Sequence, residues 1–73
     1  MVQQEVIIYT KRGDISSELL KKRFNREGVK YKEFDVSTDA EARKEMLELS
    51  GGQDIVPVVV MGERVLVGLE SGR

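Results

Sequence analysis

The sequence predicts one small α/β domain in which helices pack on a four-stranded mixed sheet. Two short β-branched or aromatic runs are each followed by an amphipathic helical segment, and a pair of apolar strands around a tight turn comes last. The element order is therefore βαβαββ, and a right-handed helical crossover makes the first two strands parallel. A chain of 73 residues has room for a single domain over residues 1–73.

The first strand and the first helix lie on either side of the turn KRG. Glu5 to Thr10, EVIIYT, has the pattern of a buried strand. Asp14 stands where a helix N-cap is expected, and Gly28 stands at the C′ position beyond the helix. The apolar residues between them recur at helical spacing: Ile15, Leu19, Leu20 and Phe24. We expect these four side chains to face the core.

A second strand and a second helix follow. The stretch KYKEFDV alternates and predicts a strand whose apolar or aromatic members are Tyr31, Phe34 and Val36. Thr38 and Glu41 then fit a capping box at the start of a helix. Its apolar stripe consists of Ala42, Met46, Leu47 and Leu49, and the pair Gly51-Gly52 ends it. The last segment, VPVVVMGERVLVGL, predicts two strands around a type II′ turn at Gly62-Glu63.

Composition excludes several classes of function. Twelve basic and 13 acidic residues are interleaved and leave a net charge of −1, which argues against a nucleic-acid-binding or membrane-binding surface. The absence of Cys and His excludes disulfides, thiolate chemistry, imidazole bases and the usual zinc or iron ligands. No apolar run approaches the about 20 residues of a membrane span, and the N-terminus does not resemble a signal peptide. We therefore expect a soluble cytoplasmic protein without a metal.

The pieces VIIYTKRG, GVKYKEFDV and AEARKEMLELSGGQDIVPVVVMGERVLVGLES together resemble the glutaredoxin branch of the thioredoxin fold. The resemblance implies a thioredoxin-like fold of glutaredoxin type, with the family's last helix missing because the chain ends at Arg73. Glutaredoxins carry C-x-x-C or C-x-x-S at the start of the first helix, where this chain has Asp14-Ile15-Ser16-Ser17. A carboxylate cannot exchange a disulfide, and the Ser17 hydroxyl without a base stays protonated. No thiol–disulfide exchange is expected of this chain.

The resemblance also implies a ligand site. It assigns a cis peptide bond to Pro57, beside which the backbone of Val56 would pair with the cysteinyl part of glutathione or a thiol peptide. Lys11 and Gln53 would face the glycyl carboxylate of glutathione. The γ-glutamyl end would meet Gly68, Leu69, Glu70 and Ser71. Each position has a simpler interpretation: Asp14 as a helix cap alone, Lys11 as a solvated side chain, Gln53 as a loop residue, and Pro57 as a trans residue opening a strand.

Two hypotheses of function follow. The first is a glutaredoxin-like module without a redox-active cysteine, which binds a thiol peptide, a protein partner, or glutathione. We expect glutathione to bind only in the millimolar range, about −4 kcal/mol, because Asp54 repels its carboxylate and the last helix is missing. The alternative is an oxidoreductase whose cysteine or selenocysteine at position 14 is lost or substituted. The missing helix would also uncover apolar sheet surface, which favours a protein partner or a weak homodimer.

Overall fold

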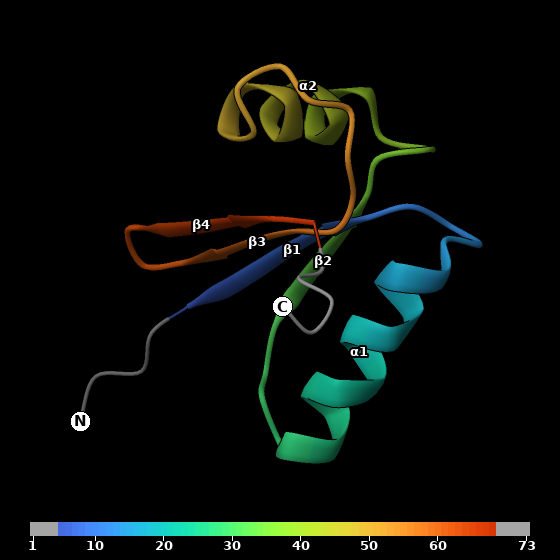
Figure 1. The fold of residues 1–73 in the computed structure, drawn as a ribbon, viewed down its shortest axis with the longest axis vertical. Coiled ribbons are helices and arrows are strands. Elements are labelled where there is room, and N and C mark those ends of the chain that lie inside the picture. Colours follow the sequence, from blue (N-terminus) through green and yellow to red (C-terminus); the bar gives the residue numbers. More distant parts are fainter. Residues whose placement is uncertain (1–4, 69–73) are drawn as a thin grey trace.

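The computed structural model describes residues 5–68 and has the predicted order of elements (Figure 1). The strands are β1 (Val6–Thr10), β2 (Lys32–Asp35), β3 (Val58–Met61) and β4 (Arg64–Val67), and the helices are α1 (Ile15–Glu27) and α2 (Ala40–Leu49). The sheet order is β2-β1-β3-β4, with β1 parallel to β2, β1 antiparallel to β3, and β3 antiparallel to β4. The predicted four-stranded mixed sheet and thioredoxin-like architecture are confirmed.

The sheet separates the two helices, so that α1 covers one face and α2 the other (Figure 1). Neighbouring residues of a strand point to opposite faces, which divides the core into two clusters. The cluster on the α1 side consists of Val6, Ile8, Leu20, Phe24 and Val59. The cluster on the α2 side consists of Tyr9, Val36, Ala42, Met46 and Val58. Together the two clusters hold both helices against β1 and β3, the two central strands.

Helix α1 has the predicted ends but not the full predicted core face. Asp14 is the N-cap, and Gly28 ends the helix with a φ of 74°, a left-handed conformation that favours glycine. The buried face, however, contains Ser17, Leu20 and Phe24. The prediction that Ile15 and Leu19 face the core is wrong, because they are 75% and 52% exposed. At 3.6 residues per turn, both lie on the outward side of the helix, opposite the row at positions 17, 20 and 24 that meets the sheet.

Helix α2 begins one residue later than the predicted capping box requires. Its N-cap is Asp39, whose Oδ1 accepts a hydrogen bond from the backbone N–H of Ala42 at 3.1 Å. The Thr38 hydroxyl instead donates to the backbone carbonyl of Asp35 at 3.4 Å. The chain turns tightly after β2, which gives Thr38 a role in that turn and leaves the cap to the next residue. The capping box of Thr38 and Glu41 was therefore wrong, although the helix itself was predicted correctly.

The β3–β4 hairpin turns at Gly62-Glu63. Gly62 has a φ of 61°, and no residue other than glycine has a positive φ among residues 5–68. A positive φ at the first central residue alone is the pattern of a type II′ turn. The turn therefore fixes the pairing of Met61 with Arg64, and from it the register along the whole hairpin.

Candidate functional site

The candidate site lies at the edge of the sheet where β1 ends and β3 begins. Tyr9 pairs with Val58, so Pro57 lies beside Thr10 at the next position of the two antiparallel strands. On the other side, the backbone N–H of Gly68 donates to the carbonyl of Pro57 at 2.7 Å. The sheet thus brings the turn after β1, the residues before β3 and the residue after β4 to one place.

Val56 presents a free stretch of backbone at this edge. The Val56–Pro57 peptide bond is cis, Pro57 is buried and Val56 is half-buried. Within residues 5–68, neither the N–H nor the carbonyl of Val56 has a hydrogen-bond partner. Backbone polar groups of this kind normally find partners in a folded protein or in water. They can pair with the extended backbone of a bound peptide in the way that a strand edge does.

Three hydrogen bonds fix the turn between β1 and α1. The N–H of Asp14 donates to the carbonyl of Lys11 at 3.0 Å, and the N–H of Lys11 donates to Ser17 Oγ at 3.4 Å. The N–H of Ser17 donates to Asp14 Oδ2 at 2.8 Å. The half-buried Asp14 carboxylate therefore lies at the positive end of the helix dipole, where a negative charge is stabilised. It supplies no sulfur nucleophile, and the fully buried Ser17 acts as a link within the turn.

Electrostatics around the turn combine exposed cations with a fixed anion. Lys11 and Arg12 are exposed, and Asp35 follows on the neighbouring strand β2. The Ser37 hydroxyl and N–H donate to Asp35 Oδ1 at 2.6 and 2.9 Å. These bonds lower the pKa of Asp35, with a smaller contribution from the backbone and charge of Arg12. Asp35 is thus ionised, and its charge partly balances that of Arg12.

A polar network on the α1 face supports the end of β1. The hydroxyl of Thr10, which is 1% exposed, donates to Glu33 Oε2 at 2.7 Å, and Lys21 Nζ lies 3.0 Å from the same oxygen. Partial burial would raise the pKa of Glu33, but the hydrogen bonds from Thr10 and Lys21 outweigh it and lower that pKa. The sequence did not reveal this network, because its members come from β1, α1 and β2 and share no sequence motif.

The remaining predicted site residues differ in their placement. Gln53 is exposed, and its backbone carbonyl accepts a hydrogen bond from Ser50 Oγ at 2.6 Å. Within residues 5–68, no hydrogen bond joins its side chain to the Lys11 turn. Asp54 Oδ2 is 2.8 Å from a guanidinium nitrogen of Arg43. The expectation that Asp54 repels a carboxylate stays a prediction, and Arg43 provides a counter-charge that the sequence did not indicate. Leu69, Glu70 and Ser71 lie outside the described residues.

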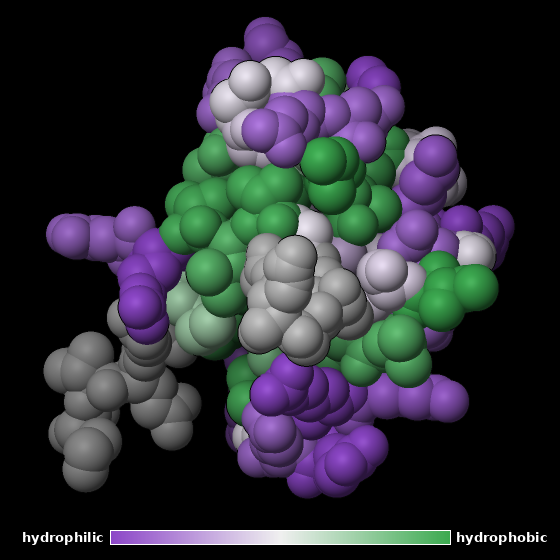
Figure 2. Space-filling view, in the orientation of Figure 1, coloured by the Kyte–Doolittle hydropathy of each residue, from purple (hydrophilic) through white to green (hydrophobic). Residues whose placement is uncertain are grey.

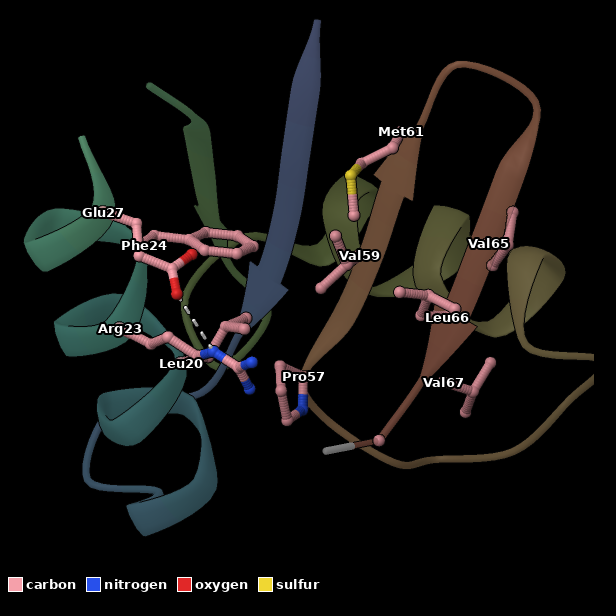
Figure 3. Close-up of a pocket in the computed structure, with 11 residues that line it drawn as sticks. Leu20, Arg23, Phe24, Glu27, Pro57, Val59, Met61, Val65, Leu66 and Val67 are labelled. Carbon is pink, nitrogen blue, oxygen red and sulfur yellow. Dashed lines mark ion pairs between the residues drawn. The ribbon is translucent and has the colours of Figure 1, made fainter. Parts of the chain in front are cut away.

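An apolar groove of about 410 Å³ begins at this edge and runs along the α1 face of the hairpin. In Figure 3, Leu20 and Phe24 of α1 lie across it from Val59 and Met61 of β3 and Leu66 of β4. Its polar rim comes from α1 and includes an ion pair of 3.6 Å between Arg23 and Glu27. Figure 2 shows apolar side chains over the hairpin between the polar surfaces of the two helices. The apolar residues of the hairpin were visible in the sequence, but not which of them would line a groove with α1.

The described part of the chain offers little for other chemistries. Within residues 5–68, no three acidic side chains gather into a group that could hold a metal ion. In the same range no helix combines the length and the apolar composition needed to cross a membrane. What the site can do chemically is to pair with a peptide backbone at Val56 and to attract a carboxylate with Lys11.

Comparison with known proteins agrees with this geometry. The sequence model of the glutaredoxin family matches residues 6–66. The chain belongs to the glutaredoxin family. Because the chain has no cysteine, it is a glutaredoxin in which no residue can serve as the redox-active thiol. A comparison with curated protein sequences finds no match.

Solved structures give the same fold. A mutant of the thioredoxin-like protein BC3987 is 26% identical, with 93% of this chain and 86% of that chain covered and a TM-score of 0.82. Glutaredoxin from Brucella melitensis is 34% identical, with 88% and 68% covered and a TM-score of 0.71. Buckwheat glutaredoxin in complex with glutathione is 20% identical, with 89% and 61% covered and a TM-score of 0.74, which supports the fold alone.

Proposed function

We propose that this chain is a glutaredoxin-like binding module without redox activity, which holds glutathione weakly or the thiol segment of a peptide at the Val56–Pro57 edge. The observation that carries the proposal is the backbone of Val56, which has no hydrogen-bond partner within residues 5–68 and lies beside the buried Pro57 in a member of this family. Binding through backbone groups requires no particular side chain. It is therefore compatible with the change of the motif to Asp14-Ile15-Ser16-Ser17.

The charges of the site favour weak binding of a ligand with carboxylates. Lys11 is exposed and next to the turn, where it can attract a carboxylate. Arg43 offsets the charge of Asp54, but both side chains are largely exposed, so solvent screens this pair. Asp14 adds a negative charge where the family has a thiol. Glutathione should therefore bind in the millimolar range, about −4 kcal/mol.

Titration by NMR tests the proposal directly. Adding glutathione to the ¹⁵N-labelled chain should shift the amide signals of Lys11, Val56 and Gly68 with a millimolar dissociation constant. S-methylglutathione should bind equally well, since the proposed contacts involve the ligand's backbone and carboxylates and leave its sulfur unused. Lys11→Gln should weaken both titrations, whereas Lys44→Gln, which removes an exposed charge from α2, should not. Shifts absent at about 10 mM ligand, or confined to residues far from Val56, would overturn the proposal.

A second candidate function is a thiol–disulfide oxidoreductase whose nucleophile at position 14 is replaced. The observation that favours it is the Ser17 N–H, which points at the side chain of residue 14 from the first turn of α1. Such a helix N-terminus lowers the pKa of a thiol. The reaction requires a thiolate that attacks the glutathione sulfur of a mixed disulfide and releases the substrate thiol. A second glutathione thiolate then attacks the new mixed disulfide, which regenerates the enzyme thiolate and yields oxidised glutathione.

Asp14→Cys separates this candidate from the binding module. The variant should have a thiol pKa below the free value of about 8.5 and should reduce glutathione mixed disulfides with glutathione as reductant. Leu19→Cys is the matched control, because Leu19 is 52% exposed on the same helix and the chain contains no other cysteine. If the thiol at position 14 titrates like the one at position 19 and shows no activity, the oxidoreductase alternative is wrong.

A further inference from the structure

The two edges of the sheet differ in composition. The outer edge of β2 carries three charged residues in four, Lys32, Glu33 and Asp35, which discourage pairing with another strand. The outer edge of β4 carries the run Val65-Leu66-Val67, and Val65 and Leu66 are 38% and 49% exposed. Within residues 5–68, no strand pairs with that edge. An apolar edge strand of this kind is a template for a further strand.

The hydrogen-bond pattern of the hairpin shows which groups of β4 are free. Gly68 donates its N–H to Pro57, so Gly68 belongs to a hydrogen-bonded pair, and such pairs alternate along an antiparallel ladder. Leu66 and Arg64 therefore direct their N–H and carbonyl groups toward β3. Val65 and Val67 direct theirs toward the open edge. The strand thus offers two residues with outward donor and acceptor groups, separated by Leu66.

We propose that β4 pairs antiparallel with β4 of a second copy of this chain, with a two-fold axis at Leu66. In this register Val65 lies opposite the partner's Val67, and each such pair exchanges both N–H···O bonds. Leu66 lies opposite the partner's Leu66 in a non-hydrogen-bonded pair, where side chains approach most closely. The arrangement is self-complementary, as a two-fold interface must be.

Charge and register both favour this pairing over its alternatives. Arg64 would lie opposite the partner's Gly68, so the pairing places no like charges opposite one another, and the net charge of −1 gives little repulsion between copies. Moving the axis to Val65 would bring the turn residue Glu63 into the ladder. Moving it to Val67 would leave Val65 opposite a residue beyond β4. The register centred on Leu66 alone pairs all outward groups of β4 within the strand.

The pairing would join the two sheets without changing their layers. A two-fold axis perpendicular to the sheet keeps both α1 helices on one face and both α2 helices on the other. Leu66 lies opposite Val59 on the α1 face, so the two apolar grooves would meet along the interface. Neither Lys11 nor Val56 takes part. Among the described residues, Gly68 is common to the dimer and to the proposed ligand site, and the dimer can fail without affecting binding at Val56 and Lys11.

Charged substitutions of Leu66, the residue at the two-fold axis, provide the main test. Sedimentation velocity over a concentration series should show reversible dimerisation of the unmodified chain. Leu66→Lys and Leu66→Glu should each be monomeric, because they place like charges opposite one another, and their half-exposed position should leave the monomer fold intact by circular dichroism. An equimolar mixture of the two variants should dimerise again. A chain that stays monomeric up to about millimolar concentration, or a mixture no more dimeric than its components, would overturn the proposal.

Cross-linking provides a second test that does not depend on affinity. Leu66→Cys places one thiol of each copy at the axis, where a Cα separation of about 4.5 Å suits a disulfide. Under mild oxidation it should form a covalent dimer much faster than Leu19→Cys, a control of similar exposure, 52% against 49%, on α1. Equal rates for the two variants would show that encounters are random and that β4 is not the interface.

Discussion

The Asp14 side chain should stabilise the domain as a helix cap, whatever its role in binding. Its one hydrogen bond within the described residues is the 2.8 Å contact from the Ser17 N–H, and Asp14→Ala removes it. Loss of an N-cap of this kind costs about 0.5–2 kcal/mol. In a domain of this size each kcal/mol lowers the melting temperature by about 4–8 °C. Asp14→Asn should recover most of the loss, because an amide oxygen accepts the same bond without the charge.

Chemical denaturation with a matched variant tests this reasoning. Asp39→Ala removes the equivalent cap of α2, a 3.1 Å hydrogen bond to the Ala42 N–H, and should cost a similar free energy of unfolding. Only Asp14 lies at the candidate site, so Asp39→Ala should leave the glutathione titration unchanged. A normal stability for Asp14→Ala, or an Asp14→Asn variant as unstable as the alanine variant, would refute the capping argument. The second result would assign the stabilisation to the charge.

Two further predictions concern the core and the polar network. Met46→Ala should destabilise the domain by about 2–5 kcal/mol, because Met46 is fully buried, whereas Leu49→Ala on the same helix, 38% exposed, should cost much less in urea unfolding. Equal losses of unfolding free energy in the two variants would contradict the placement of Met46 on the buried face of α2 and of Leu49 on its exposed face. The lowered pKa of Glu33 means that its contribution to stability is present above the unfolded pKa of about 4.3 and is lost as pH falls through the folded pKa. The unmodified chain should therefore have a higher free energy of unfolding than Glu33→Gln at pH 7, and the difference should vanish at acidic pH. A difference that does not change with pH would show that ionisation of Glu33 is unimportant.

The sequence predicted those features that depend on a few neighbouring residues. The type II′ turn needs a glycine at its first central position, and Gly62 supplies it. The start of α1 needs a short acceptor side chain, and Asp14 supplies it. These local signals, together with apolar periodicity, determined the order of the elements. The order of the elements and the handedness rule for crossovers then determined the sheet.

Features that depend on packing between distant elements could not be predicted in this way. Leu19 is apolar and at helical spacing, yet α1 turns its row of residues 17, 20 and 24 toward the sheet. The ion pair of Arg43 with Asp54 joins α2 to the loop before β3. The sequence shows the charge of Asp54 but does not indicate that Arg43 lies next to it. In both cases the deciding contact comes from the relative placement of two elements, which residue spacing within one element does not specify.

The fold would allow a glutaredoxin to lose its reactive thiol and keep the proposed binding edge at Val56. Residue 14 is positioned by the first turn of α1, and any acceptor side chain that caps the helix satisfies that position. The backbone of Val56, which has no hydrogen-bond partner within residues 5–68, and the buried Pro57 are instead positioned by β3. The pairing of β3 with β1 and the contact from Gly68, the residue after β4, hold them there. Because different elements fix the two halves of the site, a substitution at position 14 can abolish thiol chemistry without displacing Val56. Asp14 even strengthens the cap, since a carboxylate is a better acceptor for the Ser17 N–H than a neutral thiol. We therefore expect a substitution at position 14 to change the thiol chemistry and the local charge without displacing the backbone of Val56.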